Sequence, residues 1–283
     1  MKKKIFAALG IMTGTSLDGV DLSLIKSDGI NEFEAILDDY FEFNKNIQKK
    51  TEKLRDQLSN IDDLDTYSKD LNQLEREITM FIGEIINEFI KKNTLEIDLI
   101  GFHGQTIFHD SSKKISIQLG NGNLLSSITK KIVINNFRQK DLLNGGQGAP
   151  LAPIYHKLIS TIINKKHKIE FPINIINIGG ITNITKIVNN DLDTSKNIFA
   201  FDIGPGNCLI DGWIKKNSSK RFDRNGEFAK SGNIDKLILN QAIDNFSGNN
   251  FDTSLDVKNF DFSFAKGLSI EDGCATITKF TAY

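Results

Sequence analysis

The chain has 283 residues, 39% of them hydrophobic, which is enough for one large or two ordinary domains with a buried core. Its 35 Lys and Arg residues nearly balance 36 Asp and Glu residues, so neither nucleic acid nor an anionic membrane is an expected partner. No apolar run approaches the roughly 20 residues that span a bilayer. Two cysteines cannot make a disulfide framework, and we therefore expect a cytoplasmic globular protein.

The first apolar run, residues 4–12, is too short for a signal peptide, and we interpret it as a β-strand. Residues 22–25 resume a strand pattern, which predicts a hairpin with residues 13–21 as its turn. Backbone N–H groups and hydroxyls of this turn can hold phosphate oxygens, and a carboxylate such as Asp18 can hold Mg²⁺. Because Gly, Ser, Thr and Asp are also the ordinary turn formers, a purely structural turn is an equal alternative.

A long polar stretch, residues 46–92, carries apolar residues at helical spacing from Leu71 to Phe89, which predicts an amphipathic helix packed on a core. The strand pattern of residues 97–102 then delivers His103 at its end, where α/β proteins bind ligands. His103 is a candidate sugar contact or acid/base group, although a lone histidine is more often structural. His103 and His109 lack the accompanying ligands of a zinc site, and we reject one.

Two turn-rich segments follow, residues 119–123 and 135–150. In the second, Arg138 and Asp141 precede three glycines, so backbone can approach a ligand while charged side chains flank it. A flexible interdomain linker is nearly as good an interpretation. The segment is also the best domain boundary, because residues 151–163 predict a helix that starts new structure.

The second half of the chain repeats a feature of the first. Residues 173–188 alternate as a hairpin with Gly179 and Gly180 at its centre, which matches the first hairpin in kind. Two such hairpins, each followed by helices, suggest a duplicated α/β domain. Residues 268–282 predict a helix with acidic residues in its first turn.

Between these segments, an apolar run ends at Asp202 and is followed at once by a Gly-Pro-Gly turn. Gly204 and Gly206 can bring backbone N–H groups close to an anion, and Leu209 and Trp213 belong to a following amphipathic helix. This order predicts a phosphate-binding turn with Asp202 at a strand end. The alternative is a structural corner with a capping aspartate.

Five segments together resemble the anhydro-N-acetylmuramic acid kinases, a branch of the sugar kinase and actin superfamily. They are residues 12–21, 101–106, 145–153, 177–183 and 201–207, and they occur in the family's order. The resemblance runs over essentially the whole chain. It implies an α/β fold with two ribonuclease-H-like domains, of the actin-like ATPase kind, around a cleft. We expect these domains at 1–140 and 141–283.

The resemblance also implies a reaction. These kinases use ATP, Mg²⁺ and water to open 1,6-anhydro-N-acetylmuramic acid and phosphorylate it to N-acetylmuramic acid 6-phosphate, in peptidoglycan recycling. Asp202 matches the catalytic aspartate, and Asp18 is the candidate metal ligand. Candidates for binding ATP are Gly14, Thr15, Ser16, Leu17, Asp18, Gly19, Val20, Asp21, Gly204, Gly206 and Asn207. Candidates for binding the sugar are His103, Gln105, Arg138 and Asn183.

The small sugar is the expected partner, with a homodimer left open. The sequence departs from the family pattern at two places. Ile203 stands where the family usually has threonine, which removes one hydroxyl. The chain also ends at Tyr283, before the family's glycine-rich adenosine segment and a further carboxylate, so we expect the second domain to be truncated. The alternative function is therefore a non-catalytic, sugar-binding remnant of the kinase.

Overall fold

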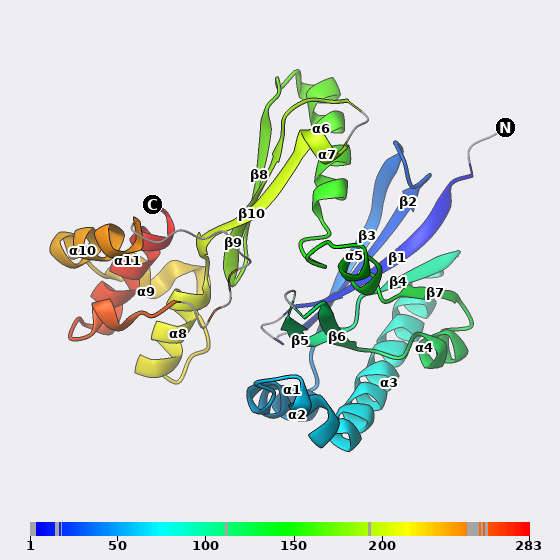
Figure 1. Cartoon of the computed structure of the whole chain (residues 1–283), viewed down its shortest axis with the longest axis horizontal. Helices are drawn as coiled ribbons and strands as arrows, with labels where there is room; N and C mark the ends of the chain where they lie inside the picture. The colour runs from blue at the N-terminus through cyan, green and yellow to red at the C-terminus, as the bar shows by residue number, and fades with distance from the viewer. Residues whose placement is uncertain are drawn as a thin grey trace. The chain divides into compact units, whose positions relative to one another are not determined.

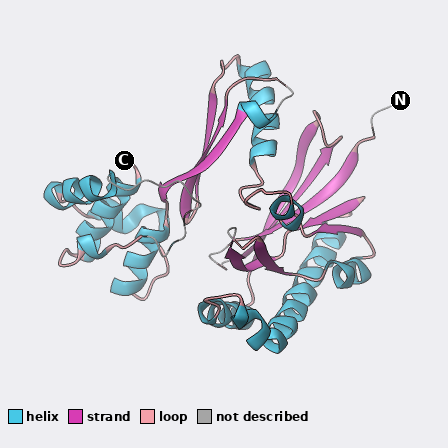
Figure 2. Ribbon diagram, viewed as in Figure 1, coloured by secondary structure: helices cyan, strands magenta, loops and turns pink. Residues whose placement is uncertain are grey.

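The computed structural model describes residues 4–14, 17, 19–110, 113–191, 194–247, 255, 257 and 260–283. It shows a mixed α/β fold, as expected (Figures 1 and 2). The chain forms two compact units, residues 1–151 and 152–283. None of the helices in these described ranges is long and apolar enough to cross a membrane.

Unit 1 is built on a five-stranded sheet in the order β3-β2-β1-β4-β7 (Figure 1). Its strands are β1 (Phe6–Thr13), β2 (Gly19–Ser27), β3 (Phe33–Glu42), β4 (Leu99–Phe102) and β7 (Ile132–Asn135). The first three strands are antiparallel, whereas β4 runs parallel to β1 and β7 runs parallel to β4. The predicted first hairpin and the strand before His103 are confirmed. Because β1, β4 and β7 run in one direction, their carboxyl ends meet at one edge of the sheet.

Helices pack on this sheet and bury its core. They are α1 (Lys45–Gln57), α2 (Asp62–Thr66), α3 (Ser68–Asn93), α4 (Gly122–Thr129) and α5 (Gln139–Leu143), and a small hairpin of β5 (Gln105–Asp110) and β6 (Ile115–Leu119) lies beside them. The predicted amphipathic helix is α3, which buries Ile78, Ile82 and Phe89 completely. Leu9 of β1 and Ile100 of β4 belong to the same apolar cluster. Burial of this stripe is what fixes α3 against the sheet.

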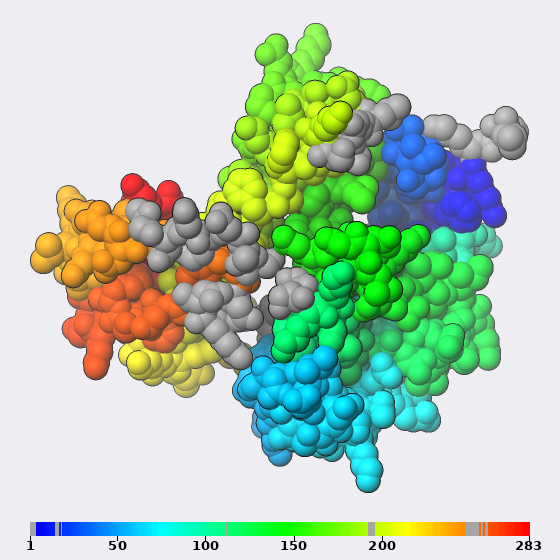
Figure 3. All heavy atoms as spheres, viewed as in Figure 1, coloured from blue at the N-terminus to red at the C-terminus, as the bar shows by residue number. Residues whose placement is uncertain are grey.

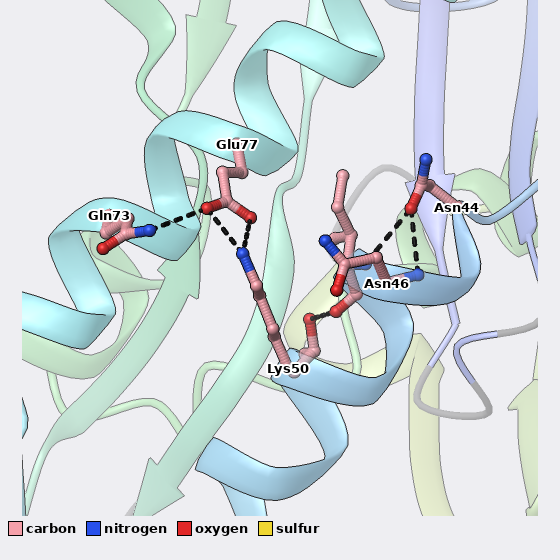
Figure 4. A network of polar contacts seen from close by, with 7 residues as sticks. Asn44, Asn46, Lys50, Gln73 and Glu77 are labelled. Atoms are coloured by element: carbon pink, nitrogen blue, oxygen red, sulfur yellow. Dashed lines mark hydrogen bonds and ion pairs between the residues drawn. The ribbon is translucent and has the colours of Figure 1, made fainter.

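Polar contacts join α1 to α3 on the surface of unit 1 (Figure 4). Asn44 caps α1 by accepting the N–H of Asn46 at 2.9 Å. Lys50 Nζ lies 2.8 Å from both carboxylate oxygens of Glu77, and Gln73 Nε2 donates to Glu77 Oε1 at 2.9 Å. The hydrogen bond from Lys50 is the main reason that the pKa of Glu77 is lowered. Such exposed pairs orient helices but contribute little to stability.

Unit 2 begins with helix α6 (Pro153–His167) and a three-stranded antiparallel sheet in the order β10-β9-β8. The strands are β8 (Ile173–Ile178), β9 (Ile181–Ile187) and β10 (Ile198–Pro205), with the short helix α7 (Thr194–Asn197) before β10. Helix α6 contacts the sheet through His156 Nδ1, 2.8 Å from Thr185 Oγ1. The helix predicted from residue 151 and the second predicted hairpin are therefore confirmed.

A helical cluster completes unit 2 (Figure 3, orange and red for its last part). It contains α8 (Cys208–Asn217), α9 (Glu227–Ser231), α10 (Lys236–Ser247) and α11 (Ile270–Thr281), with 3-10 turns at Arg224–Gly226 and Ser263–Ala265. Trp213 is buried in its apolar core and donates its indole N–H to the Ile270 carbonyl at 2.9 Å. Phe246 of α10 meets Phe280 of α11 edge-on, with ring centroids 5.5 Å apart. The helix predicted for residues 268–282 is α11.

Candidate functional site

Three sequence-predicted segments meet at the carboxyl edge of the parallel strands in unit 1. Thr13 ends β1, His103 follows β4 directly, and Arg138 follows β7 by three residues. Thr13 Oγ1 donates to the Gly104 carbonyl at 3.2 Å, and His103 Nδ1 lies 2.7 Å from that same oxygen. This edge is where open α/β sheets bind their ligands.

His103 and Arg138 form a hydrogen-bonded pair across this edge. Arg138 Nε donates to His103 Nε2 at 2.9 Å. Since a guanidinium only donates, Nε2 is the acceptor, and the ring proton therefore sits on Nδ1 and is donated to the Gly104 carbonyl. Burial, and next the charge of Arg138, lower the pKa of His103 below its ordinary value of 6.5. The imidazole is thus held neutral in a single tautomer.

The loop after Arg138 is folded around Asp141. Arg138 Nη1 donates to the Gly148 carbonyl at 2.6 Å, and the Gly148 N–H donates to Asp141 Oδ2 at 2.7 Å. The segment predicted as one long loop, residues 135–150, therefore contains helix α5 and closes on itself through these contacts. Arg138 and Asp141 thus both bind backbone at Gly148, near the end of the loop. Burial also lowers the pKa of Arg138.

Gln105 contacts the turn of the first hairpin through its side chain. Its side chain is 1% exposed, and its Nε2 lies 3.4 Å from the Gly14 carbonyl and 3.3 Å from the Thr106 carbonyl. Its Oε1 is buried and has no hydrogen-bond partner among the residues that the structure describes. Gln105 was predicted to bind the sugar, but in this structure its contacts are with backbone that carries the turn.

The first hairpin turn is closed by a hydrogen bond from the Leu17 N–H to the Gly14 carbonyl at 3.2 Å. Leu17 has a positive φ of 55°, and its side chain is completely buried, as is that of Val20. These side chains anchor the turn, so only their backbone can face a ligand. Asp21 of β2 is exposed. The candidates Thr15, Ser16 and Asp18 lie outside the described residues.

Tyr40 covers the start of β2. A Cβ added to Gly19 would lie 2.2 Å from the Tyr40 ring, so the ring can lie over this position only because residue 19 has no side chain. The described residues contain no group of three or more His, Cys, Asp or Glu side chains that could hold a metal ion. With Asp18 outside the described ranges, the residues present do not by themselves fit Mg²⁺.

In unit 2, polar side chains form a row across the sheet. Asp202 of β10 pairs with Asn183 of β9, and Asn183 pairs with Asn177 of β8. Directly paired residues project from the same face of an antiparallel sheet. Asn177 was missed as a candidate, although its place opposite Asn183 follows from the hairpin register with Gly179 and Gly180 in the turn.

Asp202 lies at a β-bulge and not at the end of its strand. The register shifts between Asp202 and Gly204, which leaves Ile203 as the extra residue, and β10 continues to Pro205. This corrects the prediction of a strand end: the bulge, which is common beside active sites, re-aims the side chain within the strand. Asp202 Oδ2 accepts the N–H of Leu255 at 2.8 Å. In the described part of the chain its second oxygen has no partner.

The Gly-Pro-Gly turn packs on the turn of the second hairpin. The N–H groups of Gly206 and Asn207 donate to the carbonyls of Gly180 and Gly179, at 2.9 and 2.7 Å. A Cβ added to Gly206 would lie 2.2 Å from the Gly179 oxygen. We predicted that backbone N–H groups of this turn would face an anion. In this structure the N–H groups of Gly206 and Asn207 donate to carbonyls instead. Their contacts fix the end of β10, which carries Asp202.

Comparison with known proteins gives a family model and relatives that all carry the same description. A family model described as anhydro-N-acetylmuramic acid kinase matches residues 6–266. The anhydro-N-acetylmuramic acid kinase of Pelagibacter ubique is 49% identical over 282 residues, which cover 99% of this chain and 73% of the relative. The enzyme of the same name from Haemophilus influenzae is 37% identical over 240 residues, covering 83% of this chain and 58% of the relative. That of Rhodopseudomonas palustris (strain ATCC BAA-98 / CGA009) is 33% identical, with 98% and 74% covered.

Proposed function

Because this chain belongs to the anhydro-N-acetylmuramic acid kinase family, we propose that it converts 1,6-anhydro-N-acetylmuramic acid, ATP and water to N-acetylmuramic acid 6-phosphate and ADP. The chain is a kinase, and ATP is accordingly one of its substrates. The observation that carries the reaction is Asp202, whose carboxylate is oriented by Leu255 at one oxygen and has no partner among the described residues at the other. A carboxylate held in this way is suited to take a proton from water. The sugar product would return to peptidoglycan synthesis.

We propose a ribonuclease-H-like fold for each unit. The order β3-β2-β1-β4-β7, with three antiparallel strands followed by two parallel ones, supports this for unit 1. In unit 2 the three antiparallel strands have the order β10-β9-β8. This corresponds to the order β3-β2-β1 in unit 1, with the same relative strand directions. Such a duplicated core is the arrangement that the sequence pattern suggested.

The reaction needs one base and one acceptor of phosphate. Water attacks the anomeric carbon of the anhydro sugar while Asp202 takes its proton, and the bond from that carbon to O6 breaks. The oxygen O6 then attacks the γ-phosphorus of ATP, and ADP leaves. Asn183 and Asn177, in the row with Asp202, would donate side-chain N–H groups to the sugar.

We assign the ATP phosphates to the first hairpin turn. Gly14, Leu17, Gly19 and Val20 would contribute backbone groups, and the buried side chains of Leu17 and Val20 keep that backbone in place. Asp21, Thr15, Ser16 and Asp18 remain candidates from the sequence. Mg²⁺ would neutralise phosphate charge, but the described residues do not fit it, and no step above runs through a metal ion.

The remaining candidates have supporting or recognition roles. Gly204, Gly206 and Asn207 hold the end of β10, since two of their amides already bind the turn of the second hairpin. Gln105 holds the first turn through the Gly14 carbonyl. His103 and Arg138 present a polar pair at the sheet edge, and we assign them to the sugar.

The direct test is to incubate the purified chain with ATP and the anhydro sugar and to follow ADP and phosphomonoester by phosphorus NMR. N-acetylmuramic acid, which lacks the anhydro bridge, is the matched control. We expect ADP and a 6-phosphate only with the anhydro sugar. Equal use of both sugars would contradict the proposal. Binding of the sugar without phosphorylation would support the alternative of a sugar-binding protein.

A further inference from the structure

The tip of the Phe246 ring lies against the backbone of β10 at Gly204. Phe246 is the last apolar residue of α10, and its Cζ atom lies 3.1 Å from the position that a Cβ on Gly204 would occupy. Because Gly204 has no side chain, the ring reaches the strand itself. Helices α10 and α11 lie beside this end of β10 (Figure 1). The contact therefore joins the helical cluster of unit 2 to the strand that carries Asp202.

This contact falls at the bulge of β10. Asp202 pairs with Asn183 of β9, whereas Gly204 pairs with Thr182, the neighbour of Asn183. Neighbouring residues of a strand project from opposite faces of a sheet, and paired residues project from the same face. Asp202 consequently projects from one face, and the Cβ position of Gly204 lies on the other. Phe246 thus supports the bulge from the face opposite the carboxylate.

Two other aromatic rings hold Phe246 in this position. The Phe280 ring of α11 meets it edge-on with centroids 5.5 Å apart, and the centroid of the Phe260 ring lies 6.4 Å away. Phe280 and Phe260 both pack against the apolar core that contains Trp213. A ring packed between others cannot withdraw without opening a cavity, so the core of the helical cluster fixes where Phe246 lies.

The contact between Phe246 and Phe260 also bears on the hydrogen bond that Asp202 accepts. Leu255 donates its N–H to Asp202 Oδ2 at 2.8 Å, and Leu255 lies between these two phenylalanines in the chain. The ring contact brings the two ends of that segment together. Loss of the Phe246 ring would therefore act on Asp202 in two ways, through the backbone of the bulge and through the donor at Oδ2.

The strand on either side of the bulge is held without Phe246. After the bulge, Thr281 Oγ1 of α11 donates to the Gly206 carbonyl at 3.2 Å, and the Gly206 N–H donates to the Gly180 carbonyl at 2.9 Å. Before the bulge, the pairing of β10 with β9 is regular up to Asp202. We expect removal of the ring tip to loosen the bulge while the rest of β10 stays in place.

Resting on the proposed function, we propose that Phe246 is a positioning residue for Asp202. Its ring tip holds the bulge that aims the carboxylate, and its contact with Phe260 keeps the Leu255 N–H on Oδ2. Because the ring lies on the opposite face of the sheet from the carboxylate, it acts through β10 and not on the substrate. Misplacement of a reacting group by about 1 Å can cost about 10²-fold in rate.

The test compares Phe246→Leu with Phe246→Met in the full chain. The two new side chains have similar volumes, but only methionine is long enough to reach the place of the ring tip. The kcat for the anhydro sugar, measured by ADP release, should fall about 10- to 100-fold in Phe246→Leu and about threefold or less in Phe246→Met. The KM for the sugar should stay within about threefold of the parent in both variants.

Phe264→Leu is the matched control. The Phe264 ring also meets Phe280, with centroids 5.3 Å apart, whereas the three atoms nearest to the Cβ position of Gly204 all belong to Phe246. Phe264→Leu and Phe246→Leu should lower the urea midpoint of unfolding to a similar extent, because each shortens one ring of the same group. Only Phe246→Leu should lower kcat, and Phe264→Leu should keep it within about twofold.

A second measurement does not need activity. Exchange of the Leu255 amide hydrogen, followed by NMR in a chain labelled with nitrogen-15 leucine, reports its hydrogen bond to Asp202, and the signal is identified by its absence in Leu255→Ile. Exchange should be about tenfold faster in Phe246→Leu, as for loss of one hydrogen bond, and unchanged in Phe264→Leu. An unchanged exchange rate in Phe246→Leu would contradict the proposal.

The two measurements separate this proposal from the proposed function. A parent that transfers no phosphate contradicts the proposed function, and exchange of the Leu255 amide then decides by itself whether Phe246 positions Asp202. In a parent that transfers phosphate, full kcat in Phe246→Leu, or an equal loss in Phe264→Leu, overturns the role of Phe246 alone. An equal loss in Phe246→Met would also overturn it, since the reach of the side chain would then not matter.

Discussion

The two β-hairpins that open the two units have the same topology but different surroundings at their turns. In unit 1 the turn between β1 and β2 is held from one side, where Gln105 contacts the Gly14 carbonyl. In unit 2 the turn between β8 and β9 is capped by the start of α8, because its carbonyls accept the N–H groups of Gly206 and Asn207.

This difference separates the roles that similar sequence patterns suggested. A Gly-rich turn whose carbonyls are bound by a following helix is structural support, and in unit 2 it supports the strand that carries Asp202. The turn in unit 1 has no such cap among its described residues, and it lies at the same sheet edge as His103 and Arg138, which follow the parallel strands β4 and β7. This difference agrees with our proposal that the first hairpin binds phosphate and that the second unit carries the catalytic base.

The largest expected effect is that of Asp202→Asn. The substitution keeps the shape and removes the proton acceptor, so kcat should fall by about 10²–10⁴ while the sugar still binds. ADP release measures the rate, and circular dichroism checks the fold. Asn183→Ala, which removes a neighbour in the same row, should affect KM more than kcat. A rate for Asp202→Asn within a few-fold of the parent would remove it from this role.

Gly206→Ala tests the cap on the second hairpin. The new Cβ would lie 2.2 Å from the Gly179 oxygen, which is backbone and cannot move aside cheaply. We expect a loss of about 1–3 kcal/mol in the free energy of unfolding, measured by urea denaturation. Gly180→Ala is the control, because a Cβ there meets nothing within 4 Å. Its cost should stay below about 0.5 kcal/mol. An equal loss in the free energy of unfolding for the two variants would show that the close approach of Gly206 to Gly179 does not stabilise the fold.

Gly19→Val tests the first hairpin. The added side chain would meet the Tyr40 ring, which is 49% exposed and can swing out, so the cost in folding should be smaller than at Gly206. Backbone approach to phosphate should suffer instead, with ATP binding about tenfold weaker by calorimetry. Combining it with Tyr40→Ala should recover stability but not ATP affinity. If the double variant also regains its affinity for ATP, the hairpin is only structural.

The smallest effect concerns pH. Burial lowers the pKa values of His103, His109 and His156 below the ordinary 6.5. Unfolded histidines take up protons as the pH drops below 6.5, whereas the folded ones resist until their lowered pKa is reached. The contribution of these three histidines to the free energy of unfolding is therefore fully present above pH 6.5. It is lost as the pH falls from there towards their lowered pKa values.

His103→Gln should make this loss shallower, because one of the contributing groups is gone. Urea midpoints measured at several pH values between about 8 and 5 give the slope. His167→Gln, at an exposed position of α6, controls for the substitution itself. An unchanged slope in His103→Gln would mean that its neutral state contributes nothing to folding.

Much of the fold followed from sequence where burial imposes a pattern. The stripe from Leu71 to Phe89 predicted α3, and the alternation of residues 173–188 predicted β8 and β9, because each buries one side. The edge strand β3 was missed because its four acidic residues do not alternate regularly with its apolar ones, and because most of its side chains are exposed. Helix α5 was missed because Asp141 and Arg138 stabilise it through contacts with Gly148 that no local pattern reveals.

The candidate site was predicted by residue type more than by arrangement. His103 and Asp202 were chosen from their places after apolar runs, Arg138 from its glycine-rich loop, and Asn183 from the family resemblance. The bulge at Ile203 and the pairing of His103 with Arg138 depend on contacts between segments far apart in sequence, and these the sequence does not show.

The most direct test of the account is phosphorylation of the anhydro sugar in water enriched in oxygen-18, with the product analysed promptly by mass spectrometry. If Asp202 activates water to attack the anomeric carbon, the sugar phosphate gains one heavy oxygen on that carbon and none in its phosphate. Asp202→Asn should form almost no labelled product. Heavy oxygen in inorganic phosphate alone, with no labelled sugar phosphate, would show simple ATP hydrolysis and contradict the proposed reaction.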